Sequence, residues 1–352
     1  MKTKTRQTKK SHSKKQSYTL MPPRARRIVA ISVFLLVFIS LGAFGIRTQR
    51  QENANAATSP AKVSAEKRVN AQTLDLTIKS PSIESSSKKV RLLLPAGWSK
   101  KANRTWPTLW LLHGGVGNYE DWTKNTDVAK LVAGHDVIVV MPDTSWCSAY
   151  SDWWNYGHYG KPAWETYITK ELPQLLQTSY HANTTRAIAG PSMGGLGAMK
   201  LAANHPGAFK AAASYSGNLD PLHSYNRQAT QPDKPGQACF ADWKRVWGDY
   251  KVPSQKAIWQ KNNPYDLAPK LKGTKYLYIS SGDGKSNPLR SGVSPDPAEQ
   301  EVNRQGKAMV TRLQNAGIPV NSYFYAGSHA WPYWQQQLHA SFPGMLQAMN
   351  TK

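Results

Sequence analysis

The chain has 352 residues, of which 40% are hydrophobic and 10% aromatic, so it is long enough to bury a large core in one or two domains. Its formal net charge is +24, and half of that excess lies in residues 1–51, which contain no acidic residue. No nucleic-acid recognition motif accompanies this charge, so we expect no nucleic-acid partner.

The N-terminal region predicts export to the far side of a membrane. A basic arm (1–27) precedes an uncharged apolar run (28–46) that is long enough to cross a bilayer as a helix. Because positive flanks stay in the cytoplasm, the rest of the chain is expected outside the cell membrane. We favour an uncleaved signal anchor. Cleavage of a signal peptide near Ala56, in an Ala-x-Ala-like site, is the alternative and would make the protein secreted.

After a polar segment (47–70) predicted to be a flexible linker, residues 71–352 alternate between strand and helix patterns. Strands are expected at 73–80, 88–95, 107–114, 136–143, 185–190, 209–217, 275–282 and 319–327. Helices are expected at 164–180, from the turn after 190 to about 204, at 298–317, and from 331 to the end. This order predicts an α/β domain with a mostly parallel eight-stranded sheet flanked by helices, and an antiparallel edge where the first two strands follow directly.

One motif in this domain points to nucleophilic catalysis. Gly190-Pro191-Ser192-Met193-Gly194 matches G-x-S-x-G, the sharp strand-to-helix turn that exposes a nucleophilic serine. A pentapeptide with so few fixed residues is a weak signal alone, but here it follows an apolar strand and opens a helix, as the mechanism requires. No phosphate-binding glycine motif is present.

A nucleophilic serine on such a turn needs a base and an acid, and the expected order along the chain is serine, then acid, then histidine. His329 in "GSHAW" lies just beyond the last strand and is the expected base. For the acid, Asp283 follows the seventh strand and Glu299 opens the next helix, where a carboxylate could instead serve only the helix dipole. The backbone N–H groups of Met193 and Gly115 are the expected oxyanion hole, the second from "HGGVG" after the third strand.

From about residue 85 to 345 the chain resembles the antigen 85 mycolyltransferases and the esterase D group of α/β-hydrolases. The resembling segments are "SAYSDWW" (148–154), "WETYITKELPQLL" (164–176), "GPSMGGLGAMKLAANHPGAF" (190–209), "NNPYDLAPKL" (262–271), "YISSGDG" (278–284) and "GSHAWPYWQQQL" (327–338). The resemblance implies the α/β-hydrolase fold, with Ser192 as nucleophile, His329 as base, and Gly115 and Met193 as oxyanion donors.

The same resemblance bears on the acid and on substrate binding. Mycolyltransferases have a Glu followed five residues later by Arg, as Glu299 and Arg304 are here, so we favour Glu299 over Asp283. Trp331 matches a Trp that borders the family's acyl and sugar site. His113-Gly114 stands where mycolyltransferases have Asp-Gly, residues of their substrate site, and this departure makes trehalose specificity doubtful.

Aromatic residues gather in two further segments. Residues 218–271 contain Trp243, Trp247, Tyr250 and Trp259 and are a candidate lid. Residues 146–164 are similarly aromatic and could stack on sugars, although core packing is the commoner use of such side chains. Cys147 and Cys239 both lie in the exported part, where a disulfide is permitted but cannot be inferred from two cysteines.

Together these features predict an extracytoplasmic serine ester hydrolase that works through an acyl-enzyme, with an ester substrate that is a lipid or an acylated sugar. The alternative is an acyltransferase that moves the acyl chain to a sugar or cell-envelope hydroxyl. A third hypothesis, a non-catalytic surface binding protein, fits less well with the retained serine, glycines and histidine. No cofactor and no metal are expected, because no CxxC, HExxH or Cys/His cluster is present.

Overall fold

The computed structural model describes residues 60–83, 87–223, 242–289 and 295–351. The chain divides into two compact units, 1–58 and 59–352, and every described residue belongs to the second. The predicted basic arm and membrane segment therefore lie outside the described residues. In the described part of the chain, no helix has both the length and the apolar character needed to cross a bilayer.

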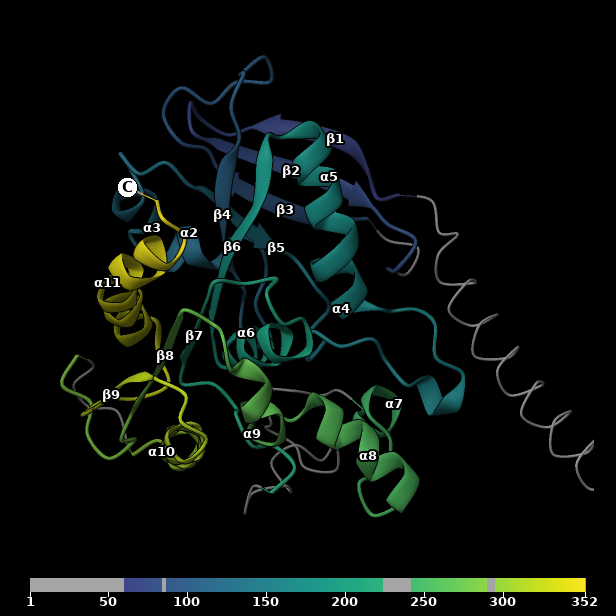
Figure 1. Cartoon of the computed structure of the whole chain (residues 1–352), viewed down its shortest axis with the longest axis vertical. Helices are drawn as coiled ribbons and strands as arrows, with labels where there is room; N and C mark the ends of the chain where they lie inside the picture. Colours follow the sequence, from purple (N-terminus) through teal and green to yellow (C-terminus); the bar gives the residue numbers. More distant parts are fainter. Residues whose placement is uncertain (1–59, 84–86, 224–241, 290–294, 352) are drawn as a thin grey trace, which may run out of the picture. The chain divides into compact units, whose positions relative to one another are not determined.

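A nine-stranded sheet forms the centre of the domain, with the order β1-β2-β3-β5-β4-β6-β7-β8-β9 (Figure 1). The strands are β1 (Lys62–Arg68), β2 (Thr73–Lys79), β3 (Lys88–Leu93), β4 (Trp106–Leu111), β5 (Ile138–Pro142), β6 (Ala182–Pro191), β7 (Ala211–Tyr215), β8 (Tyr276–Gly282) and β9 (Asn321–Tyr325). β1, β2 and β3 pair antiparallel with their neighbours. The pairs from β5 through β9 are all parallel. The mostly parallel sheet with an antiparallel edge is thus as predicted.

The sheet has one strand more than predicted. β1 lies inside the segment predicted to be a flexible linker, and its sequence, KVSAEKR, is exposed along almost its whole length. It pairs through its backbone with β2 at the edge of the sheet, with Glu66 opposite Leu76. Because only one edge of β1 is paired and neither face is buried, the strand has no hydrophobic alternation from which it could be predicted.

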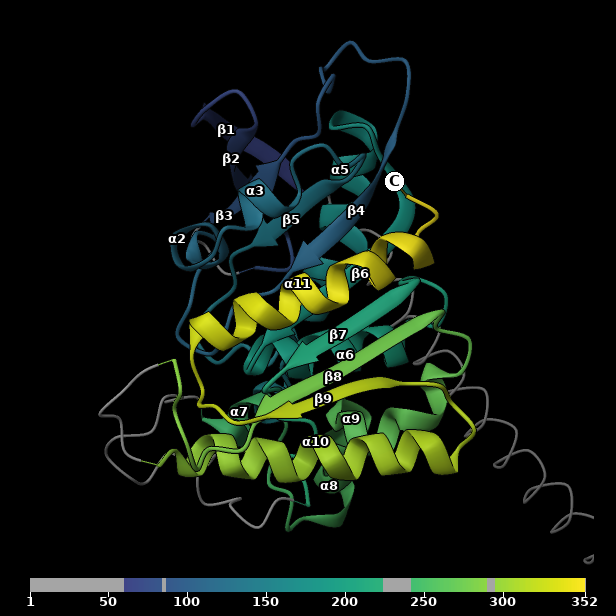
Figure 2. The ribbon, with the colours of Figure 1, turned by 90° about the vertical axis from the view of Figure 1, so that its left-hand side faces the viewer.

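Helices cover both faces of the sheet. They are α2 (Asp121–Asn125), α3 (Val128–Leu131), α4 (Trp164–Thr166), a π-helical turn (Tyr167–Glu171), α5 (Leu172–Ser179), α6 (Met193–Asn204), α7 (Trp243–Val246), α8 (Pro253–Asn262), α9 (Pro264–Leu267), α10 (Pro297–Asn315) and α11 (Trp331–Ala348), with short 3₁₀ turns at Asn155–Gly157 and Ala268–Leu271. α11 runs across one face of the sheet, and α10 lies along its β9 side (Figure 2).

The two faces bury separate hydrophobic clusters because side chains alternate along each strand. In β4, Leu109 packs in the cluster under α2, α3 and α11, whereas Trp110 packs in the cluster under α5, α6 and α10. β6 repeats the alternation with Ala189 and Ile188. With both faces covered, the parallel strands read as continuous apolar runs. Their carboxyl ends form one edge of the sheet, and the predicted catalytic residues follow directly from it.

Candidate active site

Ser192 stands on a strained turn between β6 and α6. Its backbone has φ 55° and ψ −120°, in the left-handed half of the map that residues other than glycine rarely adopt. The Ser192 N–H donates to the Tyr215 carbonyl at 2.9 Å, which ties the turn to the end of β7. The Ser192 residue is partly exposed, although Pro191 and Met193 on either side are buried.

The flanking glycines are required by close backbone packing. A Cβ atom on Gly190 would lie 2.6 Å from the carbonyl carbon of Gly194, and one on Gly194 would lie 2.8 Å from the carbonyl oxygen of His113. A larger residue at Gly190 would clash within the turn itself, and one at Gly194 would push the turn away from the segment that follows β4. The motif therefore has a steric explanation, and the turn presents the serine hydroxyl at the edge of the sheet.

His329 and Glu299 meet at the same edge. His329 follows β9, and its Nδ1 lies 2.6 Å from Glu299 Oε2, which belongs to the first turn of α10. The Glu299 side chain is completely buried, whereas the His329 side chain is 23% exposed. With Nδ1–H donating to the carboxylate, Nε2 is left as the free nitrogen that can accept a proton. The ring also packs edge-on against Trp334, with ring centroids 4.9 Å apart.

Neutral donors hold the second oxygen of Glu299. Oε1 accepts hydrogen bonds from Ser216 Oγ at 2.7 Å and from the Gly282 N–H at 2.5 Å. The Ser216 Oγ in turn accepts from Trp334 Nε1 at 3.0 Å. None of these partners carries a charge, so within the described residues no cation competes with the histidine for this carboxyl group. Ser216 and Trp334 were not identified from the sequence, and the one available signal was that Ser216 directly follows β7.

Asp296 connects the acid and the histidine through their backbones. Its Oδ1 accepts from the Glu299 N–H at 3.1 Å and caps α10, while its Oδ2 accepts from the His329 N–H at 2.9 Å. One carboxylate thus sets the position of both residues.

Asp283, the alternative acid, has different partners. Its Oδ1 accepts from the backbone N–H groups of Lys285, Ser286 and Gly327. Burial of Asp283 raises its pKa, but these three hydrogen bonds and the charge of Lys285 outweigh that effect and lower it. The structure therefore places Glu299, and not Asp283, against the histidine. Arg304 does not reach Glu299 and pairs with Glu301 at 2.7 Å.

The predicted oxyanion donors come from two separate segments beside Ser192. Met193 is the first residue of α6, and Gly115 belongs to the loop after β4. In the described part of the chain, neither backbone N–H donates to a protein acceptor. Gly114, the neighbour of Gly115, would place a Cβ 3.9 Å from Ser192 Cβ, so this loop lies against the serine. Both N–H groups thus lack a protein acceptor in the described part of the chain, and they belong to segments that adjoin Ser192.

The side chain of His113, which was predicted to contact the substrate, is buried. The residue is 1% exposed, and its Nε2 accepts from the Thr144 N–H at 3.1 Å. The ring proton is therefore on Nδ1, which donates to the Gly114 carbonyl at 2.6 Å. Burial lowers the pKa of His113 to about 4, so the ring is neutral near pH 7. The histidine shapes the loop and has no free ring nitrogen for a ligand.

Trp331 lies two residues after His329 in the first turn of α11, and it is partly exposed. Its ring packs edge-on against Trp122 and Trp334, with centroid distances of 5.2 and 5.1 Å. Trp334 also packs against the ring of His329, so Trp331 belongs to the aromatic group beside the histidine.

The aromatic segments serve mainly as core. Trp243, Trp247 and Trp259 are buried together in a cluster that also includes Leu196 of α6. Part of the candidate lid, 224–241, lies outside the described residues. In the other segment, Tyr150 and Trp164 are buried and cannot stack on a sugar, whereas Trp146, Tyr156 and Tyr159 are exposed.

Cys147 is disulfide-bonded. The sequence contains one other cysteine, Cys239, which lies outside the described residues. The Cys147 N–H donates to the Gly115 carbonyl at 2.8 Å, so the bonded cysteine also contacts the loop next to Ser192. No group of three or more His, Cys, Asp or Glu side chains suited to a metal ion occurs among the described residues.

Comparison with known proteins places this geometry in a family. The family model described as putative esterase matches residues 80–345. The diacylglycerol acyltransferase/mycolyltransferase Ag85B of Mycobacterium intracellulare is 31% identical over 257 residues, covering 69% of this chain and 76% of the relative. Ag85A of Mycobacterium tuberculosis is 31% identical over 254 residues, covering 69% and 74%.

Solved structures share the fold at lower identity. Mycobacterium tuberculosis MPT51 superposes with a TM-score of 0.63 at 22% identity, covering 81% of this chain and 99% of MPT51. The Staphylococcus aureus serine hydrolase FphF superposes with a TM-score of 0.60 at 20% identity, covering 82% and 99%. The chain therefore belongs to the putative esterase family, with the α/β-hydrolase fold, and is an enzyme of the esterase and acyltransferase class.

Proposed function

We propose that this enzyme is an extracytoplasmic serine ester hydrolase in which Ser192 is the nucleophile, His329 the base and Glu299 the acid. The observation that carries the proposal is the 2.6 Å hydrogen bond between His329 Nδ1 and a completely buried Glu299, at the edge of the sheet where the strained turn presents Ser192. A nucleophile on one turn, with a base oriented by a third group, is the general arrangement of activated serines.

In this mechanism His329 Nε2 accepts the Ser192 proton as Oγ attacks the ester carbonyl carbon. The carbonyl oxygen becomes negative between the N–H groups of Met193 and Gly115, each contributing about 3 kcal/mol to the transition state. Collapse of this intermediate breaks the bond to the alcohol, which leaves with the proton from His329. Water then attacks the acyl-enzyme in the same way and releases the acid.

Glu299 stabilises the imidazolium that forms in each step. Its charge is buried and is met only by neutral donors, so the attraction to a protonated ring is weakly screened. Gly114 and Trp331 are proposed to border the substrate, because one lies against Ser192 and the other is in the aromatic group beside His329.

Acyl transfer to a sugar or cell-envelope hydroxyl is the second function that we consider. It is favoured by the 31% identity to relatives named as acyltransferases and mycolyltransferases. The triad is the same for both outcomes, because the acyl-enzyme reacts with whichever hydroxyl, of water or of a sugar, is positioned near His329. The acceptor site therefore decides between them.

The location outside the cytoplasm is supported by the disulfide at Cys147, since such bonds persist in oxidising compartments. Attachment through residues 28–46, or secretion after cleavage near Ala56, remains part of the proposal.

The test uses the full chain in detergent with a fluorophosphonate probe and a short-chain ester. We expect an adduct on Ser192 and ester turnover, both abolished in Ser192→Ala. Turnover that persists in Ser192→Ala would contradict the assigned nucleophile. Product analysis with and without added sugar then separates the two outcomes: free acid in both indicates hydrolysis, and a new sugar ester indicates transfer.

A further inference from the structure

One buried tyrosine links the helix that follows Ser192 to the loop that carries Gly115. The Tyr150 hydroxyl donates to the carbonyl oxygen of His113 at 2.9 Å, directly before Gly114 and Gly115. Burial raises the pKa of Tyr150 well above its ordinary value, so the phenol keeps its proton and acts as a donor. His113 then passes the constraint on, since its ring donates to the Gly114 carbonyl at 2.6 Å.

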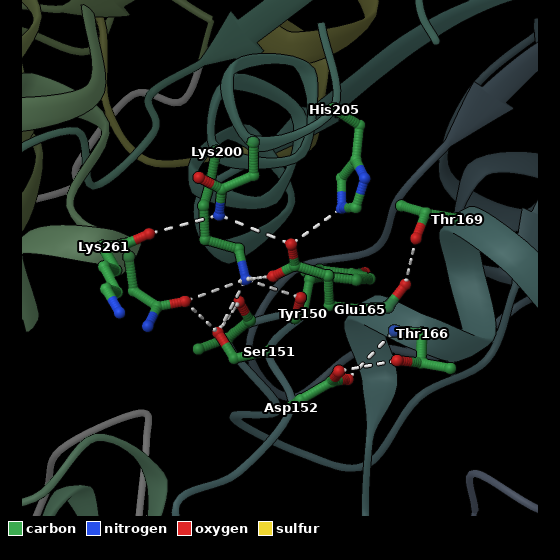
Figure 3. A network of polar contacts seen from close by, with 12 residues as sticks. Tyr150, Ser151, Asp152, Glu165, Thr166, Thr169, Lys200, His205 and Lys261 are labelled. Carbon is green, nitrogen blue, oxygen red and sulfur yellow. Dashed lines mark hydrogen bonds and ion pairs between the residues drawn. The ribbon is translucent and has the colours of Figure 1, made fainter. Parts of the chain in front are cut away.

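The other end of Tyr150 is fixed to α6. The Lys200 ammonium, which is completely buried, donates to the Tyr150 carbonyl at 2.7 Å, as Figure 3 shows. Tyr150 has φ 49°, so this contact supports a backbone conformation that a tyrosine rarely adopts. The ring packs directly on the helix, because a Cβ on Gly197 would lie 2.5 Å from Tyr150 Cδ2.

Lys200 is itself held from several directions. Its ammonium also donates to Ser151 Oγ at 2.7 Å and to Glu165 Oε2 at 2.8 Å, and Glu165 accepts from His205 at 2.8 Å (Figure 3). A buried lysine is stable only when it is paired and fully hydrogen-bonded. The network therefore fixes the Tyr150 backbone against α6 within a rigid part of the core.

This arrangement matters because the two oxyanion donors belong to different segments. Met193 N–H moves with α6, and Gly115 N–H moves with the loop after β4. Both must lie within about 3 Å of one oxygen atom in the transition state. A group that contacts α6 at one end and the loop at the other sets the distance between them, and Tyr150 has both contacts.

We propose that Tyr150 is a positioning residue, which holds the His113 carbonyl, and through it the Gly115 N–H, in register with the Met193 N–H. The inference rests on the proposed function, because it assigns those two N–H groups to the oxyanion. Tyr150 touches no substrate. It acts by preorganising a donor, which lowers the energy of the transition state more than that of the bound ester.

The test compares Tyr150→Phe with Tyr167→Phe. Tyr167 is a matched control because it is as fully buried as Tyr150 in the same hydrophobic cluster, and its hydroxyl has no hydrogen-bond partner among the described residues. Both variants lose one buried oxygen atom, but only Tyr150→Phe releases the His113 carbonyl. Each full-length protein is assayed for kcat and KM on a short-chain ester, and for inhibition by phenylboronic acid, whose tetrahedral serine adduct mimics the oxyanion.

We expect Tyr150→Phe to lower kcat by about tenfold or more with little change in KM, and to weaken boronic acid inhibition by a similar factor. Tyr167→Phe should leave both quantities within about twofold of the unmodified enzyme. Equal kcat and equal inhibition in the two variants would overturn the inference. So would a loss in Tyr150→Phe that appears only in KM or only in thermal stability.

Two further results keep the outcomes distinct. If Tyr150→Phe does not fold, Gly197→Ala replaces it, because the added Cβ would lie 2.5 Å from Tyr150 Cδ2 and would displace the ring that carries the hydroxyl. A loss of kcat of about threefold supports the inference, and an unchanged kcat overturns it. If the unmodified enzyme turns over no ester, or Ser192→Ala keeps full turnover, the proposed function has failed. If only the inference fails, the unmodified enzyme still turns over the ester and Ser192→Ala still abolishes that turnover.

Discussion

Two Glu–His pairs occur among the described residues, and their differences explain why we propose a catalytic role for only one of them. Glu299 lies 2.6 Å from His329, and Glu165 lies 2.8 Å from His205. The second oxygen of Glu299 meets the neutral Ser216 hydroxyl and a backbone N–H, whereas that of Glu165 meets the Lys200 ammonium.

The cation changes what the carboxylate can do. Burial of Glu165 opposes ionisation, but the charge of Lys200 and the hydrogen bonds from His205 and Lys200 lower its pKa to about 2. Its charge is thus already balanced by a lysine, and His205 lies at the far end of α6 from Ser192. A short Glu–His distance is therefore not enough to propose a catalytic pair. The other partners of the carboxylate and the place of the histidine relative to the serine must be considered as well.

The same substitution in both histidines gives the strongest test of this comparison. We expect His329→Gln to lower kcat on a short-chain ester by roughly a million-fold, because the serine loses its base. The kcat of His205→Gln should stay within about threefold of that of the unmodified enzyme, because the pair that it breaks is partly exposed and lies far from Ser192. Comparable losses in the two variants would show that the pairs are not functionally different.

Glu299 and Asp283 are expected to differ in their effect on kcat. Glu299→Gln is expected to lower kcat by about ten-thousand-fold, because it removes the charge that stabilises the imidazolium and orients its ring. Asp283→Asn should have little effect, because the described partners of Asp283 are backbone N–H groups, from which an asparagine oxygen can also accept. If Asp283→Asn abolishes turnover and Glu299→Gln does not, the acid has been assigned to the wrong residue.

Glu165 should matter for stability rather than for chemistry. Glu165→Gln leaves the completely buried Lys200 ammonium without its carboxylate, which is expected to cost about 3–5 kcal/mol of the free energy of unfolding. Urea unfolding measures this loss, and kcat per folded molecule should change far less than in Glu299→Gln. A stable Glu165→Gln variant with reduced kcat would reverse the two roles.

Acid should destabilise the domain in two windows. A folded-state pKa below the unfolded value means that stability is complete above the unfolded value and is lost as the pH falls through the folded one. For His113 this window runs from 6.5 to about 4, and for Glu165 from 4.5 to about 2. Across each window the free energy of unfolding is expected to fall by about 3 kcal/mol.

Urea unfolding across this pH range measures both windows. Relative to the unmodified enzyme, His113→Asn should flatten the upper window and Glu165→Gln the lower one. An unchanged pH profile in either variant would remove that residue from the explanation.

The smallest effect on kcat is expected from the loss of the Ser216 hydroxyl, which donates to Glu299. Ser216→Ala removes one of two hydrogen bonds to Oε1, and kcat should fall by about tenfold. Ser280→Ala is the matched control, because the Ser280 hydroxyl is also buried but has no partner in the described part of the chain. Equal kcat values in the two variants would exclude a positioning role for Ser216.

Much of the fold could be predicted because the parallel strands are buried on both faces and alternate with helices. β1 escaped prediction because its polar side chains carry no signal and only backbone pairing defines it. At the site, the motif around Ser192 and the place of His329 after the last strand were predictable. The choice between Glu299 and Asp283 as the acid was harder to predict, since both follow β8. Only the turn around Asp296 determines which carboxylate faces the ring of His329.

The dual contact of Asp296 couples the positions of two side chains that it does not itself touch. Because one carboxylate aligns the start of α10 with the residue after β9, Glu299 and His329 are both held through their backbones. Asn287 adds a second link, since its Oδ1 accepts from the hydroxyl of Ser328, directly before His329. A change at Asp296 alone is therefore expected to displace both members of the Glu299–His329 pair at once.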